Sequence, residues 1–212
     1  MTRDGQSKNS ARDFNVIYTF PENNIEQTKI ETARTIIRPI KMEDQFFIWK
    51  ELYGNRETMK FYHDRIPRTL KRVSSDVIGW NDLFLQGIPY SAYVVISKDS
   101  SSQKIGLIVI EARQEHDAQP GVAQIFYLFA QKFRGNGFGT ESVNAFVNYF
   151  VKEQLAKNQK FLVQGYSLQA LEMSALLENQ ASIKLIENHL KPSSMKEEER
   201  YGEKRKIYQI QY

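Results

Sequence analysis

Short segments with hydrophobic side chains at alternating or successive positions recur along the chain and predict β-strands. Residues 14–20 place aromatic or β-branched side chains at every second position, which is the period of a strand. Similar segments lie at residues 34–40, 90–97, 104–113, 122–130 and 206–212. The segment 122–130 is almost continuously apolar, as expected for a strand buried on both faces. The stretch 168–177 fits a strand or a helix, and we favour a strand because Asn179, a typical helix cap, follows it.

Apolar residues spaced three and four positions apart predict helices. The spacing occurs at residues 42–53, 69–86 and 143–155, and a shorter match adds a helical turn at 56–62. A late helix is expected from Asn179 to residue 190, with Pro192 just beyond its end. The polar stretch 196–200 shows no such period and is interpreted as charged surface.

The composition is that of a globular protein. The 212 residues are 41% hydrophobic and 25% charged, which suits one domain with a core of normal size. We predict that residues 34–212 form this domain and that residues 1–33 are an extension with room for one extra strand. The sequence has no apolar stretch long enough to cross a membrane, and its N-terminus is polar, so we expect a cytoplasmic protein without a membrane partner.

Several kinds of chemistry are disfavoured by the residue types present. The chain has no cysteine, which excludes disulfides and thiolate catalysis. Its three histidines are far apart and show no metal-ligand spacing, so no metal site is predicted. The net charge of +4 is not gathered in one tract, so no nucleic-acid partner is expected, although a mildly basic surface suits an anionic ligand.

A glycine-rich loop, RGNGFG at 134–139, lies between the predicted strand 122–130 and a predicted helix. Backbone amides at the start of a helix lack partners within the helix and attract anions. Glycines allow a phosphate to approach such amides closely and permit positive φ angles. The loop is therefore a candidate phosphate site, and a turn without a ligand is the alternative.

Three phosphate-binding patterns can be compared with this loop. A Walker A loop requires a lysine after its last glycine, and Thr140 stands there instead. A dinucleotide fingerprint requires GxGxxG early in the fold, whereas this spacing is GxGxG and lies past the middle of the chain. The acyl-CoA loop of N-acetyltransferases, Arg/Gln-x-x-Gly-x-Gly/Ala, is matched by Arg134, Gly137 and Gly139.

The sequence resembles the GNAT superfamily of N-acetyltransferases, in particular its ribosomal-protein N-terminal acetyltransferase branch. The resemblance spans residue 34 to the C-terminus. It is carried by five segments in matching order: TIIRPIKMEDQ, RETMKFY, KIGLIVI, QIFYLFAQKFRGNGFGTESV and ENQASIKLIE. The resemblance implies an α+β, sandwich-like fold, with a mixed, mostly antiparallel twisted sheet and helices on both faces.

The resemblance also implies acetyl-CoA as co-substrate and no metal. The family's pyrophosphate-binding loop corresponds to Arg134, Gly135, Asn136, Gly137, Phe138, Gly139 and Thr140. The pantetheine arm would run beside the strand that ends at Leu128 and Phe129. Asn179 and Ser182 would lie near the acetyl and thiol end. By the same resemblance, Ser182 is the candidate for protonating or hydrogen-bonding the leaving thiolate, and helix capping is its alternative role.

The attacking amine must lose a proton, so a general base is needed. Gln124 stands where many relatives carry glutamate, and an amide is no base. Glu172, on a neighbouring predicted strand, is our candidate for the base, and Glu111 and His116 are the alternatives. Each of the two carboxylates is also compatible with a surface position.

The predicted function is transfer of an acetyl group from acetyl-CoA to a primary amine, with a protein or peptide N-terminus preferred, by a monomer or homodimer. The alternatives are acetylation of a small amine, such as a polyamine or aminoglycoside, and an inactive CoA-binding module. Early aromatic residues are candidates for the acceptor cleft or for the core: Trp49, Tyr53, Phe61, Tyr62 and Trp80. Relatives end the late helix with Glu-x-x-Gly-Phe, which is missing after Glu187, so the C-terminal arrangement is not predicted.

Overall fold

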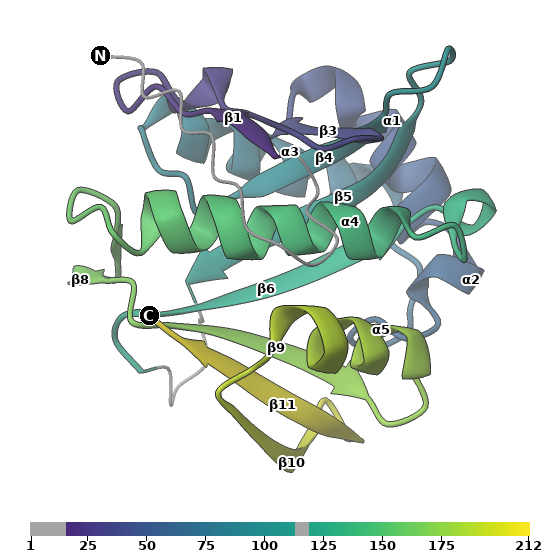
Figure 1. The fold of residues 1–212 in the computed structure, drawn as a ribbon. Coiled ribbons are helices and arrows are strands. Elements are labelled where there is room, and N and C mark those ends of the chain that lie inside the picture. Colours follow the sequence, from purple (N-terminus) through teal and green to yellow (C-terminus); the bar gives the residue numbers. More distant parts are fainter. Residues whose placement is uncertain (1–15, 113–118) are drawn as a thin grey trace.

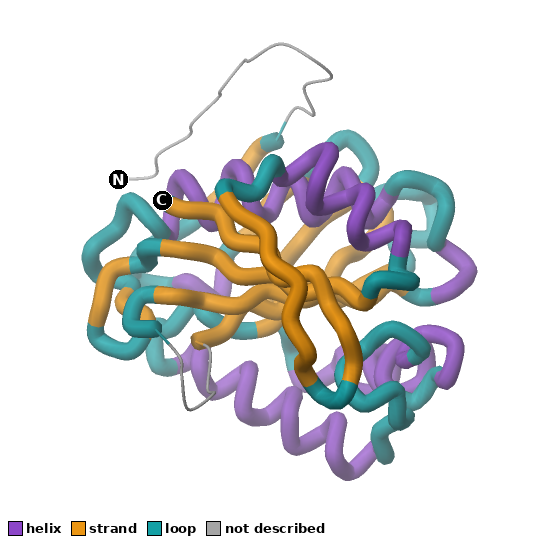
Figure 2. Tube along the Cα trace, turned by 90° about the horizontal axis from the view of Figure 1, so that it is seen from below, coloured by secondary structure: helices purple, strands orange, loops and turns teal. Residues whose placement is uncertain are grey.

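The computed structural model describes residues 16–112 and 119–212 (Figure 1). One long twisted sheet passes through the molecule, and helices cover both of its faces (Figures 1 and 2). The start of the predicted strand 14–20 and the candidate His116 lie outside the described residues. Within the described ranges, no helix has the length and apolar character that a membrane span requires.

The main sheet contains nine strands of the described residues, in the order β1-β2-β3-β4-β5-β6-β9-β11-β10. Every neighbouring pair is antiparallel except β6 and β9. The strands are β1 (Ile17–Thr19), β2 (Lys29–Glu31), β3 (Thr35–Pro39), β4 (Ala92–Ser97), β5 (Lys104–Ala112), β6 (Val122–Phe129), β9 (Ala170–Leu176), β10 (Ser194–Arg200) and β11 (Glu203–Gln211). A separate small hairpin is formed by β7 (Leu162–Val163) and β8 (Tyr166–Ser167).

Helical segments connect the strands. The α-helices are α1 (Gln45–Phe47), α2 (Arg56–Met59), α3 (Leu70–Leu85), α4 (Phe138–Ala145) and α5 (Gln180–Leu185). Three of them join π-helical segments, at Ile48–Tyr53, Phe146–Leu155 and Ile186–Leu190. Short 3-10 turns lie at Ile25–Gln27, Met42–Asp44 and Gln131–Phe133. In Figure 1, the long helix that begins with α4 crosses the front face of the sheet, and α3 lies behind it.

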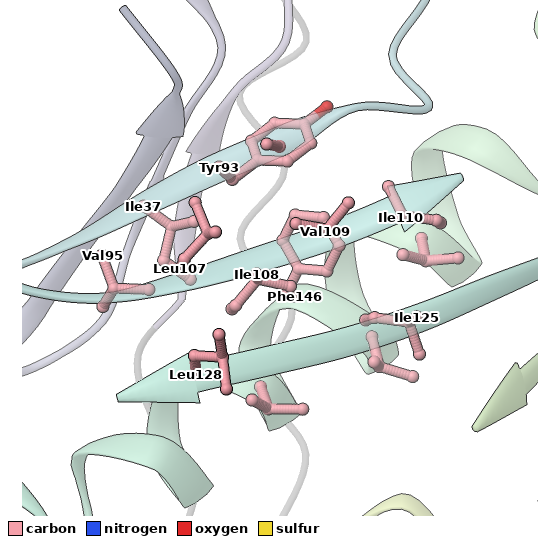
Figure 3. Packing of buried hydrophobic residues seen from close by; sticks show 14 of the residues in the cluster. Ile37, Tyr93, Val95, Leu107, Ile108, Val109, Ile110, Ile125, Leu128 and Phe146 are labelled. Carbon is pink, nitrogen blue, oxygen red and sulfur yellow. The ribbon is translucent and has the colours of Figure 1, made fainter. Parts of the chain in front are cut away.

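The core lies between the central strands and the helices that cover them (Figure 3). Tyr93 of β4 is fully buried and packs edge-on against Phe146, with ring centroids 4.8 Å apart. Ile108 of β5 and Phe150 of the following π-helical segment are also fully buried. Burying each such side chain contributes about 1.5–3 kcal/mol, so this contact fixes the helix that follows the glycine loop against the sheet.

Most predicted elements are confirmed. The stretch 168–177 contains the strand β9, as favoured from the sequence. The helix predicted after the glycine loop begins at Phe138, because Gly137 adopts a φ of 80° and caps it directly after the loop. The polar stretch 196–200 is not simply charged surface, because it forms most of the edge strand β10, paired along its length with β11. Five of the seven side chains of β10 are exposed, so it carries no hydrophobic pattern.

The strand β6 is less buried than its apolar sequence predicts. Gln124, Phe126 and Tyr127 are only partly buried, because they border a cavity rather than packed side chains. At the opposite edge of the sheet, the described part of the segment before residue 34 contributes β1 and β2, which pair with each other, and β2 pairs with β3.

Candidate active site

The parallel strands β6 and β9 separate after a short paired stretch. Their pairing covers Val122–Gln124 opposite Ala170–Glu172, and the two strands then continue to Phe129 and Leu176 without pairing to each other. The edge of β6 that faces β9 therefore offers the backbone N–H and C=O groups of alternate residues within 125–129 to a ligand. An extended molecule with amide groups can add to such an edge as a further strand would.

A cavity of about 950 Å³ occupies this fork. It is bordered by β6, β9, the glycine loop, α5, the β10–β11 hairpin and the segment around α2 and α3. The cavity brings together most of the residues predicted from the sequence: Leu128, Phe129, Arg134, Gly135, Gly137, Gly139, Thr140, Glu172, Asn179 and Ser182. Asn136 and Phe138 belong to the loop, but they do not line the cavity.

The glycine loop presents a row of unpaired backbone amides. Gly135 and Gly137 have φ angles of 78° and 80°, a region that glycine enters without steric cost. Among the described residues, no group accepts a hydrogen bond from the amides of residues 135–140. The amide of Arg134 differs, because it donates to the carbonyl of Gln131 at 3.1 Å. The available amides therefore begin at Gly135 and end in the first turn of α4, which is the arrangement of an anion site.

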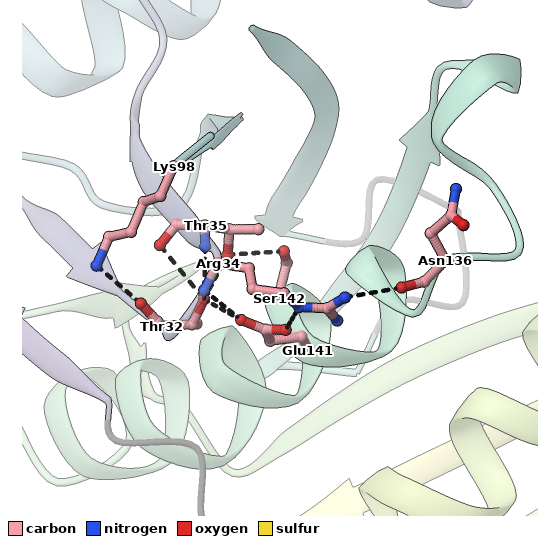
Figure 4. Close-up of polar contacts among 7 residues, drawn as sticks. All are labelled: Thr32, Arg34, Thr35, Lys98, Asn136, Glu141 and Ser142. Atoms are coloured by element: carbon pink, nitrogen blue, oxygen red, sulfur yellow. Dashed lines mark hydrogen bonds and ion pairs between the residues drawn. The ribbon is translucent and has the colours of Figure 1, made fainter. Parts of the chain in front are cut away.

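Two arginines hold the loop in place. Arg134 donates from Nε to the carbonyl of Phe129 at 2.9 Å, which ties the loop to the end of β6. Arg34, at the start of the family-like region, donates from Nη1 to the carbonyl of Asn136 at 3.0 Å (Figure 4). The Arg34 guanidinium also lies over the ring of Phe138, with its central carbon 4.8 Å from the ring centroid.

The buried carboxylate of Glu141, in the first turn of α4, is the centre of this network (Figure 4). It accepts hydrogen bonds from the Thr32 hydroxyl at 2.6 Å and from the amide and Nε of Arg34 at 2.8 and 2.7 Å. Burial opposes the charge of Glu141, but these hydrogen bonds outweigh it and lower the pKa of the carboxyl. The network joins α4 to the turn between β2 and β3.

Ser182 lies in the first turn of α5, and its hydroxyl faces the cavity. Its oxygen is 2.8 Å from the hydroxyl oxygen of Tyr127 on β6. The helix is capped by Asn179 instead, whose side-chain oxygen accepts from the amide of Ser182 at 3.2 Å. Burial raises the pKa of Tyr127 to about 12, although the bond to Ser182 partly opposes this shift. The Ser182 hydroxyl thus contacts a neutral phenol across the fork.

Glu172 lies at the end of the paired stretch and is almost fully buried. Its Oε1 is 2.6 Å from Nη1 of Arg200, and its Oε2 accepts from Nε2 of Gln209 at 3.3 Å. Both oxygens of the Glu172 carboxylate are therefore engaged by donors from the β10–β11 hairpin. The contact with Arg200 argues against the predicted role of Glu172 as the general base.

Glu111 on β5 is the second carboxylate of the cavity. It is paired in register with Gln124, whose Nε2 donates to it at 2.9 Å. Burial raises the pKa of Glu111, while the bonds from Gln124 and the nearby charge of Arg68 oppose the shift. A carboxylate is therefore present next to Gln124, on the neighbouring strand β5. In the family that the sequence resembles, position 124 itself is expected to carry glutamate.

The opposite wall of the cavity is aromatic and basic. Of the aromatic residues considered from the sequence, Phe61, Tyr62 and Trp80 line the cavity, whereas Trp49 and Tyr53 do not. Four further residues line the cavity without any signal in the sequence that marks them: Tyr127, Arg68, Arg200 and Arg205. A tyrosine within an apolar strand and arginines within polar stretches have no distinctive local pattern. Only the fold shows that they line one cavity.

The end of the late helix explains how the chain departs from the family pattern. Lys191 adopts the left-handed conformation, with a φ of 51°, at the helix end, where glycine would have no steric cost. The chain then forms β10 and β11, whose turn carries Arg200 and Tyr201 to the rim of the cavity. In the described part of the chain, no group of three or more His, Asp or Glu side chains is arranged to hold a metal ion.

Comparisons with known proteins agree with this geometry. A family model described as an acetyltransferase (GNAT) domain matches residues 34–189, which is more than half of the chain. Among curated proteins, the uncharacterized protein YkkB of Bacillus subtilis (strain 168) is 26% identical over 164 residues, covering 76% of this chain and 83% of YkkB.

Solved structures share the fold at low sequence identity. A GNAT-family acetyltransferase from Bacillus anthracis has a TM-score of 0.60 at 18% identity, covering 86% of this chain and 98% of its own. A ribosomal-protein-S5-alanine acetyltransferase from Vibrio fischeri has a TM-score of 0.64 at 15% identity, covering 86% and 96%. RimL, a ribosomal L7/L12 α-N-protein acetyltransferase solved with coenzyme A, has a TM-score of 0.60 at 14% identity, covering 84% and 94%. The predicted α+β fold, with its mixed and mostly antiparallel sheet, is confirmed.

Proposed function

The chain belongs to the acetyltransferase (GNAT) family, and from this premise we propose that it transfers the acetyl group of acetyl-CoA to a primary amine, preferably a protein or peptide N-terminus. The observation that carries the proposal is the fork between β6 and β9, next to a row of unpaired loop amides. The family resemblance seen in the sequence is thereby confirmed, and the acceptor is the part that we propose.

The residues present fit a CoA thioester. The amides of residues 135–140 and the two φ-positive glycines form a cradle for a diphosphate, which a larger side chain at either glycine would disturb. The β6 edge at residues 125–129 suits the two amides of a pantetheine arm. Bound acetyl-CoA would supply an activated acyl group, so no covalent enzyme intermediate is required, in keeping with the absence of cysteine.

Two groups on the thiol side are proposed to assist departure of the thiolate. Ser182 is the donor to the leaving sulfur, as the sequence predicts. Tyr127, whose hydroxyl oxygen is 2.8 Å away, can donate a hydrogen bond to the Ser182 oxygen while the Ser182 hydroxyl donates to the sulfur, because the raised pKa keeps the phenol protonated at neutral pH. Asn179 lines the same cavity and holds the first turn of α5, and we propose that it lies near the thiol end of the cofactor.

For the general base, we propose Glu111 ahead of Glu172. Glu172 is held by Arg200, whereas Glu111 accepts a hydrogen bond from the neutral amide of Gln124. The pKa of the Glu111 carboxyl is raised toward neutral pH, and a general base is most effective when its pKa lies near the working pH. Glu172 remains the alternative base, and the pH profiles of variants at the two positions distinguish between them.

A protein N-terminus is supported by one structural neighbour that is named as a ribosomal L7/L12 α-N-protein acetyltransferase, and a second neighbour is named as a ribosomal-protein-S5-alanine acetyltransferase. Their identity to this chain is too low to transfer the acceptor itself. Polyamines and aminoglycosides are the second acceptor class, and the inactive CoA-binding module is the third possibility, motivated by Gln124 in place of glutamate.

The test is turnover of acetyl-CoA against peptides with free N-termini, a polyamine and an aminoglycoside. Release of CoA can be followed with a thiol-reactive dye, because the protein has no cysteine of its own to react. Turnover with peptides at least about tenfold above the small amines in kcat/KM would support the proposal. Tight binding of acetyl-CoA without turnover of any amine would instead favour the inactive module.

A further inference from the structure

Two arginines, Arg200 and Arg205, line the cavity. They belong to the β10–β11 hairpin, which lies at one edge of the sheet (Figure 1). The side chain of Arg200 is 8% exposed, and Arg205 is 3% exposed. Arginine is rarely buried to this extent unless its charge is compensated, because removing a guanidinium from water is costly.

The compensation is incomplete for both side chains. Arg200 forms ion pairs with Glu172 and Glu198 at 2.6 Å each, but its Nη2 has no hydrogen-bond partner among the described residues. Arg205 donates from Nη2 to the carbonyl of His63 at 3.1 Å, and its Nε has no partner within the same residues. Glu203, whose charge acts on Arg205, forms its ion pair with Arg65.

The surroundings of Arg205 add to its uncompensated positive charge. Its guanidinium lies near two other positive charges, those of Arg65 and Arg200. Burial lowers the pKa of Arg205, and these neighbouring arginines lower it further, against the opposing effect of Tyr201 and Glu203. A negative group in this part of the cavity would relieve both the desolvation cost and the repulsion.

We infer that Arg205 and the unpartnered Nη2 of Arg200 bind a carboxylate of the amine acceptor, so that the acceptor class is an amine that also carries a negative charge. The inference rests on the proposed acetyltransferase function and deepens it. Two sources offer this chemistry: the α-carboxylate of a free amino acid, and an acidic side chain close to the N-terminus of a peptide.

The position of the arginines suits this role. Arg200 is bonded to Glu172, which pairs in register with Gln124 at the last step before β6 and β9 separate. A carboxylate held there would leave the amine of the same molecule pointing into the fork. The acidic residue Asp76, on the opposite wall, is already engaged by Arg68 and Arg72, so a polycationic acceptor finds little uncompensated negative charge there.

The experiment compares pairs of acceptors that differ only in negative charge. One pair is serine and serinamide, and the other is the amidated peptide Ser-Glu-Glu-Ala and its counterpart Ser-Gln-Gln-Ala. Wild-type kcat/KM should favour the charged member of at least one pair by about tenfold or more, since a hydrogen-bonded charge pair is being formed. The first pair responds if the source is an α-carboxylate, and the second responds if it is an acidic side chain.

Arg205→Gln should reduce that preference to within about twofold while leaving the KM for acetyl-CoA unchanged. Lys204→Gln is the matched control, because it removes the same charge from the neighbouring exposed position of β11 and should keep the preference. Arg200 is left intact because it also holds Glu172.

The inference and the proposed function fail in different ways. Equal kcat/KM within both pairs, with clear turnover, would overturn the carboxylate site and leave the acetyltransferase proposal standing. Absence of turnover with every amine would count against the proposed function. In that event, calorimetric binding of the same four compounds to the CoA-bound protein still decides the inference, and equal or undetectable binding within both pairs would overturn it.

Discussion

Arg34 and Glu141 lie 107 residues apart in the sequence, yet they share a two-point contact, through the Arg34 amide at 2.8 Å and its Nε at 2.7 Å (Figure 4). The contact joins the beginning of the family-like region to the helix that carries the glycine loop. Since Arg34 also donates to the carbonyl of Asn136, the conformation of the loop depends on a carboxylate that never faces the cavity.

Glu141→Gln should lower the free energy of unfolding by about 2 kcal/mol, because a buried carboxylate that accepts three hydrogen bonds is replaced by an amide. The value is kept modest because the Arg34 side chain is 48% exposed and water screens its charge. Chemical denaturation measures the change. Glu153→Gln, which removes a partly exposed carboxylate paired with Lys157, is the control and should change stability by less than about 0.5 kcal/mol. Equal effects of the two substitutions would contradict the role of Glu141.

The contribution of Glu141 should also depend on pH. Its folded-state pKa is lowered, so the stabilisation is complete above the ordinary value of 4.5 and is lost as the pH falls through the lower folded value. The difference in unfolding free energy between wild type and Glu141→Gln should therefore shrink between pH 4.5 and more acidic conditions. Taking this difference cancels the titration of the other carboxylates. A difference that stays constant from neutral pH to about pH 3 would count against the assignment.

Gly137→Val should weaken acetyl-CoA binding by about a hundredfold, or about 3 kcal/mol. Valine disfavours the φ of 80° at this position, and its Cβ would lie 3.2 Å from Nη2 of Arg34, so both the loop amides and their support would shift. Calorimetry measures the affinity. Gly165→Val is the matched control, because Gly165 has a φ of 84° with nothing near its Cβ position and lies outside the cavity. It should lower stability without altering affinity. Unchanged affinity in Gly137→Val would remove the diphosphate role of the loop.

Ser182→Ala should lower kcat by about tenfold or more and leave acetyl-CoA affinity within about twofold, because the hydroxyl is proposed to act on the departing thiolate. Tyr127→Phe should have a smaller effect in the same direction, since it removes only the group behind Ser182. Ser167→Ala, on the exposed strand β8, is the control. If Ser182→Ala behaves like this control, its hydroxyl has no part in the reaction.

Features of this protein that depend on neighbouring residues are predictable from the sequence, whereas contacts between distant residues are not. The glycine loop, the strand before it and the cap at Asn179 are predictable, because each depends on residues within a few positions. The Arg34–Glu141 contact and the Tyr127–Ser182 pair join residues 107 and 55 positions apart, and no local pattern marks them. The edge strand β10 was missed for a different reason: with both faces largely exposed, it has no hydrophobic period.

The two candidate bases should be distinguishable by their pH profiles. A general base must be deprotonated to act, so kcat/KM should fall as the pH drops through its pKa. Because burial raises the pKa of Glu111, this fall should occur above the ordinary value of 4.5 in the wild type. Glu111→Gln should lower kcat by about a hundredfold and remove that acidic limb, since glutamine does not titrate.

Glu172→Gln is the companion variant and should keep the acidic limb, even though losing the partner of Arg200 lowers activity. Thermal unfolding of both variants separates a catalytic effect from loss of the fold. Initial rates are measured over a range of peptide concentrations at saturating acetyl-CoA across the pH range, and the protonation of the amine itself contributes the same fall toward acidic pH in all three proteins, so the acidic limb of the base is the fall that exceeds it. If the acidic limb disappears in Glu172→Gln and persists in Glu111→Gln, the base is Glu172, and the Arg200 contact must then be broken when the acceptor binds.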